Sequence, residues 1–359
     1  MEARDVLWTT ILVAIACLGV ALTTLAYVNL VNLPPTDASL TKDLDVYTDM
    51  IKAAPLGCPS DTVLCDYYMS SSGFTVIPSN TAYTYITTES IGKVIKAGVR
   101  LVEFDVYAVN KEAVVGLANA KTQDMLTYNS LKFEDCCTTL ANKMFDPGTT
   151  AGYGNPFVLS LNIHSTDNAF ITQCAEIMKL TLRKFMLPST YSYQRKNIAL
   201  EPICNLMGKL IIVSGGNTKG NGMDELVNMS WTASNMRRLT YTQASQTFDH
   251  EELIEYNKRN ITLVVPDMDS PTISNKNPEI CFAFGCQWVA MNFGSLDNAM
   301  EVYTGKFLEN SFAIKPDEPV ELRYKPLTYK APKPQSAGVS FQPKQITSPM
   351  YDFTIKSNK

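Results

Sequence analysis

The clearest strand pattern in this chain is GVRLVEFDVY, from Gly98 to Tyr107. The segment is short, apolar and rich in β-branched residues, which is typical of a strand buried on both faces. Its two carboxylates, Glu103 and Asp105, alternate along the strand and therefore point to the same face. Four further segments share this composition and are predicted strands: Pro156–Ile163, Lys209–Ser214, Ile261–Val265 and Gln287–Phe293.

Helix-like segments alternate with these strands. They are Thr88–Ala97, Asp167–Met186, Asp249–Arg259 and Leu296–Thr304, and Asp249 and Ser295 are suitable N-cap residues. A repeated strand-then-helix order implies a parallel sheet, and this many units in one domain favour a closed α/β barrel.

The chain opens with a long apolar run. Leu7–Leu33, LWTTILVAIACLGVALTTLAYVNLVNL, contains no charged residue and exceeds the roughly 20 residues that span a bilayer. We therefore predict one transmembrane helix at residues 7–33, with the lipid bilayer as its partner, ended by Pro34-Pro35. A signal peptide cleaved after Thr24-Leu25-Ala26 is the alternative. Arg4 precedes the run and no cation follows before Lys42, which favours a single-pass protein with its N-terminus inside.

The remaining chain divides by composition. Residues 215–238 carry four glycines in their first eight positions and no clear period, so they are predicted to link two half-barrels. The predicted order is a flank at 1–6, the helix at 7–33, a stalk at 34–66, half-barrels at 67–214 and 239–316, and an extended Pro/Lys-rich tail at 317–359.

The net charge and the positions of the cysteines and histidines narrow the possible partners and sites. The net charge of −4 argues against a nucleic-acid partner. Of nine cysteines, Cys58 and Cys65 bracket the short loop GCPSDTVLC and are the best disulfide candidates, with buried free thiols as the alternative. Neither histidine neighbours a CxxC, so no zinc site is expected. Asn228-Met-Ser and Asn260-Ile-Thr are candidate glycosylation sites if the body faces a secretory compartment.

Seven segments carry a family resemblance. In chain order they are YYMSSS (67–72), GVRLVEFDV (98–106), PFVLSLNIH (156–164), GKLII (208–212), EYNKR (255–259), GCQWVAMNF (285–293) and GKFLEN (305–310). Together they resemble the X and Y halves of phosphoinositide-specific phospholipase C, over roughly residues 60–316. The resemblance implies a distorted (β/α)8 barrel of the TIM type, split by a linker between the halves. It also implies chemistry that uses two histidines and a calcium ion held by an asparagine and acidic side chains.

The sequence departs from that pattern at the residues that carry the chemistry. Gly73 stands where the resemblance places the first histidine, Phe74 where it places the calcium-binding asparagine, and Leu117 in the region of the second histidine. A missing general acid or base costs about 10²–10⁴-fold in rate. We therefore expect no catalytic residue.

The calcium ligands are also incomplete. Glu103 and Asp105 remain, and Asn162 replaces the third carboxylate, so these are vestigial calcium-site positions at which we expect hydrogen-bonding roles and no metal. A weak calcium site is the alternative. His164 matches a histidine beside that third carboxylate, and we expect it to be a framework residue. The loop that contains Asp267 and Asp269 is acidic where an inositol phosphate would bind.

These observations predict a membrane-anchored, catalytically inactive phospholipase C-like protein, without cofactor, that acts as a structural or scaffolding component. A phosphoinositide-binding protein or a residual calcium-dependent phospholipase C is the alternative. The tail from Pro326 carries five lysines and one aspartate, so we expect residues 326–359 to dock on protein partners, with a disordered solubilising end as the alternative. A large assembly beside a membrane, such as a virion whose capsid encloses a lipid layer, would suit this role. The expected contact residues are Tyr329, Lys330, Lys333, Phe341, Lys344, Tyr351 and Phe353.

Overall fold

A computed structural model describes residues 3–31, 35–48, 50, 54–59, 61–119, 122, 124–150, 152–268, 271–316 and 344–355. Within these residues, eight parallel strands follow one another in chain order around a barrel, and the last pairs with the first. They are β2 (Ser71–Ser72), β3 (Leu101–Val109), β6 (Phe157–Ile163), β7 (Leu210–Ser214), β8 (Met229–Ser230), β9 (Met236–Thr240), β10 (Ile261–Val265) and β11 (Trp288–Met291). Hydrogen-bonded pairing runs through every neighbour except β8 and β9. The barrel is therefore nearly closed, and the α/β TIM-type barrel expected from the sequence is confirmed.

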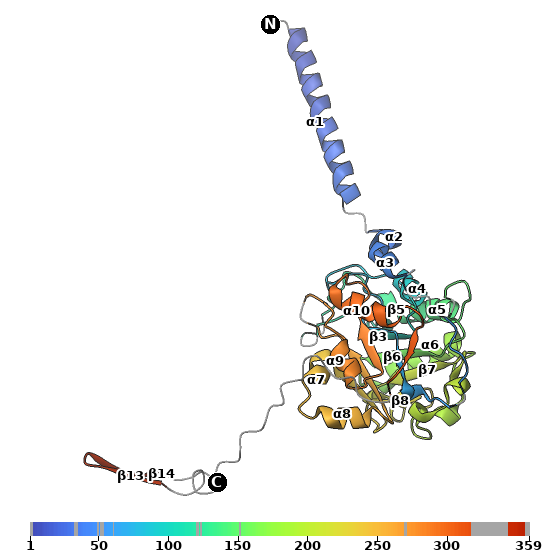
Figure 1. The fold of residues 1–359 in the computed structure, drawn as a ribbon. Helices are drawn as coiled ribbons and strands as arrows, with labels where there is room; N and C mark the ends of the chain where they lie inside the picture. The colour runs from blue at the N-terminus through green and yellow to red at the C-terminus, as the bar shows by residue number, and fades with distance from the viewer. Residues whose placement is uncertain are drawn as a thin grey trace.

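Helices surround the strands (Figure 1). They are α4 (Glu89–Lys96), α5 (Phe133–Lys143), α6 (Asn168–Leu182), α7 (Tyr241–Ser245), α8 (His250–Tyr256), α9 (Glu279–Ala283) and α10 (Asn298–Lys306). Single-turn 3₁₀ helices lie at Leu64–Asp66, Ser189–Tyr191, Ile198–Leu200, Ile203–Leu206 and Gly216–Thr218. The antiparallel strands β4 (Glu112–Val115) and β5 (Leu131–Lys132) extend the sheet beside β3, and β1 (Tyr67–Met69) pairs with β12 (Phe312–Ile314).

Strand alternation separates two apolar clusters. On β3, Val102, Phe104 and Val106 belong to the larger cluster, which includes the helix side chains. Leu101 belongs to the second cluster, which combines barrel-strand residues with residues of the 3₁₀ turns. Glu103 and Asp105 have the same parity as Leu101, so they point into the barrel. The prediction that the two carboxylates share one face is confirmed.

The predicted strands and helices all overlap observed ones, and β10 begins and ends at the predicted residues. Asp249 caps α8 as predicted, because its Oδ1 accepts a hydrogen bond from the Glu252 amide at 2.9 Å. The N-cap predicted at Ser295 is wrong: Asp297 caps α10, and the Ser295 hydroxyl lies 2.6 Å from the Asp297 carboxylate. Helices α5, α7 and α9 are not among the predicted helices.

The stretch 215–238, predicted as a linker, contains part of the barrel instead. It includes all of β8 and the first three residues of β9. Met223, Val227 and Met229 in this stretch are fully buried. Their spacing follows neither the helical nor the strand period because they sit in short strands and turns, so no periodic pattern marks this stretch as part of the core.

The predicted stalk is also partly docked. Residues 35–48 contain α2 (Asp37–Leu40), a 3₁₀ turn (Lys42–Leu44) and α3 (Asp45–Thr48). Leu44 and Tyr47 are 2% and 3% exposed. The Tyr47 hydroxyl donates to the Ser295 carbonyl at 3.3 Å, and its ring lies edge-on to Phe293. This segment is therefore packed against the barrel and does not act as a free spacer.

The disulfide predicted between Cys58 and Cys65 is wrong. Cys58 is bonded to Cys204, with 5.1 Å between their Cα atoms, within the usual range for a disulfide. Cys65 is a free, buried thiol whose Sγ lies 3.5 Å from the Lys258 carbonyl. Nearness in sequence favoured Cys65, but Cys65 is buried in the second apolar cluster, whereas Cys58 is exposed and meets Cys204.

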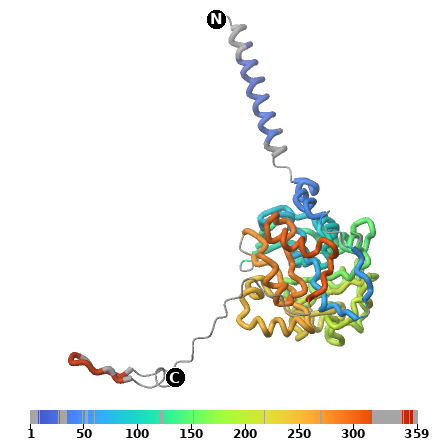
Figure 2. The backbone as a smooth tube through the Cα atoms, in the orientation of Figure 1, coloured from blue at the N-terminus to red at the C-terminus, as the bar shows by residue number. Residues whose placement is uncertain are grey.

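Segments at both ends lie outside the barrel (Figure 2). The helix α1 (Ala3–Val31) forms where the sequence predicts one. Across the part of the chain that the structure describes, no helix combines the length and apolarity needed to cross a membrane. Near the C-terminus, β13 (Lys344–Ser348) and β14 (Tyr351–Ile355) form an antiparallel hairpin. The expectation of a wholly extended tail is thus wrong for residues 344–355.

Candidate functional site

A pocket of about 250 Å³ opens at the carboxyl ends of the barrel strands. This is the end at which barrels of this type build their active sites, because the loops there are free to vary. Side chains from β3, β6, β9 and β10 and from the loops between strands line it: Phe74, Glu103, Asp105, Tyr107, Leu117, Ala118, Asn119, Asn162, His164, Arg238, Thr240, Val265, Pro266 and Met268. The pocket therefore joins the charged strand residues of both half-barrels.

The carboxylate of Glu103 accepts three hydrogen bonds in the pocket. Arg238 donates to both of its carboxylate oxygens, from Nη2 to Oε1 at 2.7 Å and from Nε to Oε2 at 3.2 Å. The Ser160 hydroxyl donates to Oε2 at 2.9 Å. The side chain of Glu103 is only 4% exposed. A buried carboxylate requires such partners, so Glu103 is fully engaged by the protein itself.

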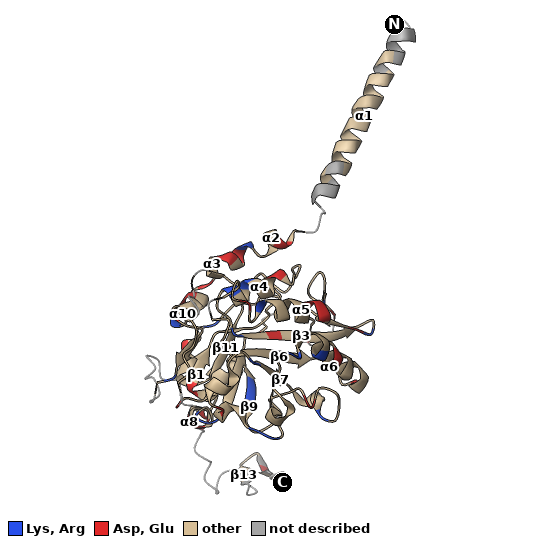
Figure 3. Ribbon diagram, turned by 90° about the vertical axis from the view of Figure 1, so that its right-hand side faces the viewer, with Lys and Arg blue, Asp and Glu red and all other residues tan. Residues whose placement is uncertain are grey.

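The positive charge that pairs with Glu103 belongs to Arg238, which reaches it from the opposite half-barrel. Figure 3 shows acidic residues within β3 and basic residues within β9. The Arg238 guanidinium carbon lies 5.5 Å from the Trp231 ring, which follows β8. Burial alone would lower the pKa of Arg238, but the carboxylates of Glu103 and Asp105 outweigh it and raise that pKa. Arg238 therefore supplies a permanent positive charge inside the barrel.

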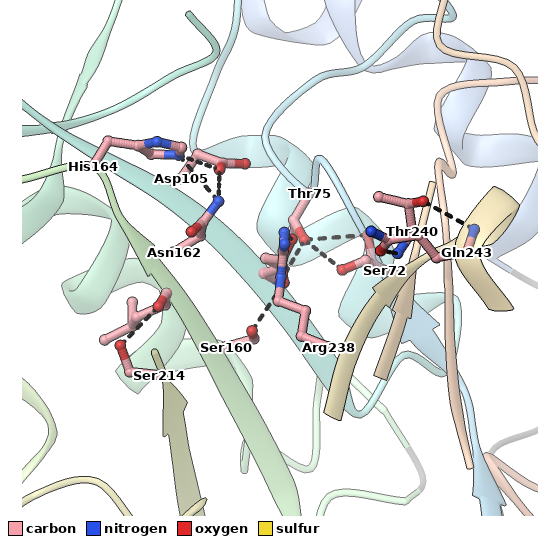
Figure 4. A network of polar contacts seen from close by, with 12 residues as sticks. Ser72, Thr75, Asp105, Ser160, Asn162, His164, Ser214, Arg238, Thr240 and Gln243 are labelled. Atoms are coloured by element: carbon pink, nitrogen blue, oxygen red, sulfur yellow. Dashed lines mark hydrogen bonds and ion pairs between the residues drawn. The ribbon is translucent and has the colours of Figure 1, made fainter. Parts of the chain in front are cut away.

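Asp105, Asn162 and His164 form a second group (Figure 4). The Asn162 side-chain amide donates to Asp105 Oδ1 at 2.7 Å, and His164 Nε2 lies 2.8 Å from the same oxygen. The His164 ring stacks on Tyr107, with 4.3 Å between ring centroids and 4° between their planes. Each of these three residues already has a protein partner. The structure thus brings Glu103, Asp105, Asn162 and His164 together as the sequence predicts.

The position of the first family histidine cannot accept a side chain in this backbone. A Cβ atom on Gly73 would lie 2.7 Å from Cδ of Pro266, well inside the contact limit. Phe74 follows with a φ of 51°, in the left-handed region that bulky residues rarely adopt. Its ring is part of the pocket wall. Pro266 and Phe74 therefore close the space that an imidazole and a metal-binding amide would need.

The region of the second family histidine is equally apolar. Leu117 lies just after β4 and is 4% exposed. Val265, Pro266 and Met268 extend the same apolar wall. None of these side chains can transfer a proton, so this wall can contact a ligand but cannot perform acid–base chemistry.

The residues present do not fit the calcium ion that the resemblance implies. Calcium takes six to eight oxygen ligands. Both oxygens of Glu103 accept hydrogen bonds from Arg238, and Oδ1 of Asp105 accepts from Asn162. A guanidinium beside these carboxylates also repels a cation. Among the described residues, no group of three or more His, Cys, Asp or Glu side chains could hold a metal ion.

The other predicted site residues lie away from this pocket. Asn228 is 2% exposed, accepts a hydrogen bond from the Ile212 amide at 2.8 Å and donates to the Tyr191 carbonyl. The prediction that Asn228 lies in an accessible linker is therefore wrong, since a glycan cannot reach it. Asn260 is half-buried, and its side chain donates to the Tyr256 carbonyl at 3.2 Å.

The predicted tail contacts divide into two sets. Lys344 lies in β13, and Tyr351 and Phe353 lie in β14. The remaining four, Tyr329, Lys330, Lys333 and Phe341, lie outside the described residues.

Sequence reasoning missed Arg238. It lies within MRRLT, at the end of the stretch that was predicted as a linker from its glycines and its lack of period. The sequence nevertheless contains a pattern that could have identified Arg238 as a site residue. Two carboxylates on a strand predicted to be buried require a cation from elsewhere in the chain, and Arg238 and Thr240 alternate like inward-facing strand residues.

Comparisons with known proteins agree with this architecture. Residues 60–215 match the phosphatidylinositol-specific phospholipase C X domain, and residues 211–318 match its Y domain. Inactive phospholipase C-like protein 1 of Mus musculus is 38% identical over 71 residues, 19% of this chain and 6% of that protein. The 1-phosphatidylinositol 4,5-bisphosphate phosphodiesterase beta-4 of Bos taurus is 36% identical over 69 residues, 18% of this chain and 7% of that protein. The matched stretch is thus a small fraction of these curated relatives.

Solved structures show the same fold over a larger share of the chain. The crystal structure of PLC21 from S. officinalis superposes with a TM-score of 0.61 at 23% identity, covering 73% of this chain and 38% of that one. PLC21 from L. pealei gives a TM-score of 0.60 at 21% identity, covering 74% and 38%.

Proposed function

Because the chain carries both the X and the Y domain of phosphatidylinositol-specific phospholipase C and so belongs to that family, we propose that it is a catalytically inactive, membrane-anchored member that acts through protein contacts. The observation that carries the inactivity is the contact of Arg238 with both oxygens of Glu103. Gly73 and Leu117 at or near the two histidine positions support it. The relative named as an inactive phospholipase C-like protein lends the proposal a precedent within the family.

Phosphoinositide binding without catalysis is a weaker candidate. Among the pocket-lining residues, Arg238 is the sole Lys or Arg, and Glu103 neutralises it. An inositol phosphate carries several negative charges and needs several cations. Asp267, in the loop beside Met268, adds negative charge nearby.

We expect the full-length chain to release no inositol phosphate from micelles that contain phosphatidylinositol 4,5-bisphosphate and calcium. Loss of both acid–base groups predicts a rate at least about 10⁴-fold below that of an active phospholipase C in the same micelles. Release well above a heat-denatured control would refute inactivity. Isothermal titration with inositol trisphosphate separates the candidates, since binding without hydrolysis would favour the headgroup-binding function.

Helix α1 supports the anchor part of the proposal. It overlaps the uncharged run Leu7–Leu33, and the proposed anchor rests on that run, because no helix among the described residues is both long and apolar enough to cross a membrane. Leu12, Leu18 and Leu25 are 62%, 61% and 61% exposed. Apolar side chains that are exposed on all sides of a helix are unfavourable in water, and the hydrocarbon core of a bilayer would bury them.

The C-terminal hairpin supports the protein-contact part. Among the described residues, β13 and β14 pair only with each other, so each has one open edge onto which a partner strand can add. We place the partners in a membrane-associated assembly, because the anchor would hold the barrel beside a bilayer.

Membrane fractionation of three chains tests both parts together. The full chain should remain in the pellet after carbonate extraction and keep Met1 or Glu2 at its N-terminus. A chain without residues 1–33 should move to the supernatant, and a chain without residues 326–359 should stay in the membrane but lose its cross-linked protein partners. A mature N-terminus near Tyr27 would identify a signal peptide, and unchanged cross-links after truncation would exclude the tail.

A further inference from the structure

We propose that the guanidinium of Arg238 takes the place of the calcium ion in this barrel, so that removing this one side chain opens a divalent-cation site formed by Glu103, Asp105, Asn162 and Ser160. The inference rests on the proposed function, because it supplies a physical cause for the proposed inactivity. It also goes beyond inactivity, since it assigns a latent cation site and the side chain that blocks it.

Position is the first argument. Glu103 and Asp105 lie two residues apart on the inward face of β3 and are 4% and 8% exposed. Arg238 reaches them from β9 on the other half-barrel and interacts electrostatically with both. A single positive charge thus faces two buried carboxylates, which is the arrangement that a bound divalent cation would otherwise provide.

Geometry is the second argument. The two hydrogen bonds to Glu103 use the planar edge of the guanidinium, and Trp231 packs near its carbon. Arginine forms such a two-point contact, whereas lysine presents a single point charge. Because this cation is covalently attached, it cannot dissociate, and the carboxylates stay compensated without any metal.

The number of oxygen atoms available as metal ligands is the third argument. Without Arg238, Glu103 and Asp105 offer four carboxylate oxygens. The Ser160 hydroxyl lies 2.9 Å from Glu103, and the Asn162 amide lies 2.7 Å from Asp105, so each can contribute one more oxygen after a side-chain rotation. Six oxygens meet the lower limit for calcium, and the adjoining pocket of about 250 Å³ has room for water ligands.

Charge is the fourth argument. Of the groups that line this pocket, Glu103, Asp105, Arg238 and His164 carry or can carry charge. Removal of Arg238 leaves two buried carboxylates with only His164 beside them. Two unpaired buried charges of the same sign are unfavourable, so this pair favours a cation between them.

The test is calcium binding by full-length Arg238→Ala, measured without any activity assay. We expect its melting temperature to fall relative to the natural chain and to recover by several degrees, saturably, on addition of CaCl₂ but not of NaCl at equal ionic strength. Terbium should give sensitised luminescence, because Tyr107 lines the same pocket, and calcium should displace it. The natural chain should show neither response.

Matched variants identify the site. Arg238→Lys keeps the positive charge and should not respond to calcium. Arg238→Ala combined with Glu103→Gln removes the carboxylate and should also not respond. If Arg238→Ala folds only when calcium is present, that dependence supports the proposal equally.

Two results would overturn it: a folded Arg238→Ala that ignores calcium and terbium, or a natural chain that binds calcium as well as the variant does. Neither result by itself refutes the proposed inactivity, which fails only if the natural chain hydrolyses phosphoinositide.

Discussion

Loss of the Cys58–Cys204 disulfide should lower the free energy of unfolding by about 3–5 kcal/mol. The bond closes a loop with a sequence separation of 146 residues, and the entropy lost by an unfolded chain on cross-linking grows with loop length. It joins the segment before the barrel to the 3₁₀ turn that contains Cys204, just ahead of β7. Because the loop is this long, the expected loss lies at the upper end of the range for a single disulfide.

Urea unfolding of Cys58→Ser, with and without reductant, measures this effect. The natural chain should lose stability when reductant is added, and Cys58→Ser should match the reduced natural chain whether or not reductant is present. Cys17→Ser is the matched control, because Cys17 is an exposed free thiol in α1, outside the barrel. Equal midpoints for the natural chain in both conditions would show that the bond is not formed.

Whether this disulfide is formed also bears on the orientation of the chain in the membrane. Disulfides persist in oxidising compartments and are rare in the cytosol. A formed Cys58–Cys204 bond in protein isolated under thiol-blocking conditions would support a barrel that faces away from the cytosol. That is the orientation which Arg4 ahead of the apolar run favours under the positive-inside rule.

The sequence was sufficient where side-chain character and period agree. Residues 261–265, ITLVV, are β-branched or apolar throughout, and β10 occupies those residues without a shift. The alternation of Glu103 and Asp105 is enough to predict that both side chains share one face of β3, because the strand period is two. The β3–β6 register then sets Asp105 opposite Asn162, which the family motifs had only implied.

The sequence was insufficient where structure depends on distant partners. Strand β8 has two residues, too few to show a period, and β9 carries Arg237 and Arg238, which resemble a solvated turn. Arg238 becomes a site residue only through Glu103, 135 positions earlier in the chain. In the same way, Cys58 lies seven positions from Cys65 but bonds to Cys204, because folding fixes which thiols meet.

Arg100 illustrates a stabilising role that composition alone conceals. It lies within GVRLVEFDVY, directly before β3, yet its side chain is completely buried. The guanidinium donates to the carbonyls of Met144 at 2.9 Å, Asn155 at 2.8 Å and Pro156 at 3.4 Å. Burial lowers the pKa of Arg100 to about 9, so the side chain still carries its charge at neutral pH.

We expect Arg100→Met to lower the free energy of unfolding by about 3–5 kcal/mol, because the three buried carbonyls would lose their donor. The Phe157 ring, whose centroid lies 4.8 Å from the guanidinium carbon, would also lose a cation–π contact. Arg100→Lys should recover part of the loss, since an ammonium group keeps the charge but cannot reach all three carbonyls in one plane.

Arg237→Met provides the matched control for Arg100→Met. Arg237 is 35% exposed and forms an ion pair with Glu252 on the surface, so its loss should cost about 0–1 kcal/mol. Chemical denaturation of the three variants, read by circular dichroism, gives the comparison. If Arg100→Met were no less stable than Arg237→Met, the carbonyls that end α5 and begin β6 would have to find other donors. The connection between these two elements would then not depend on a buried charge.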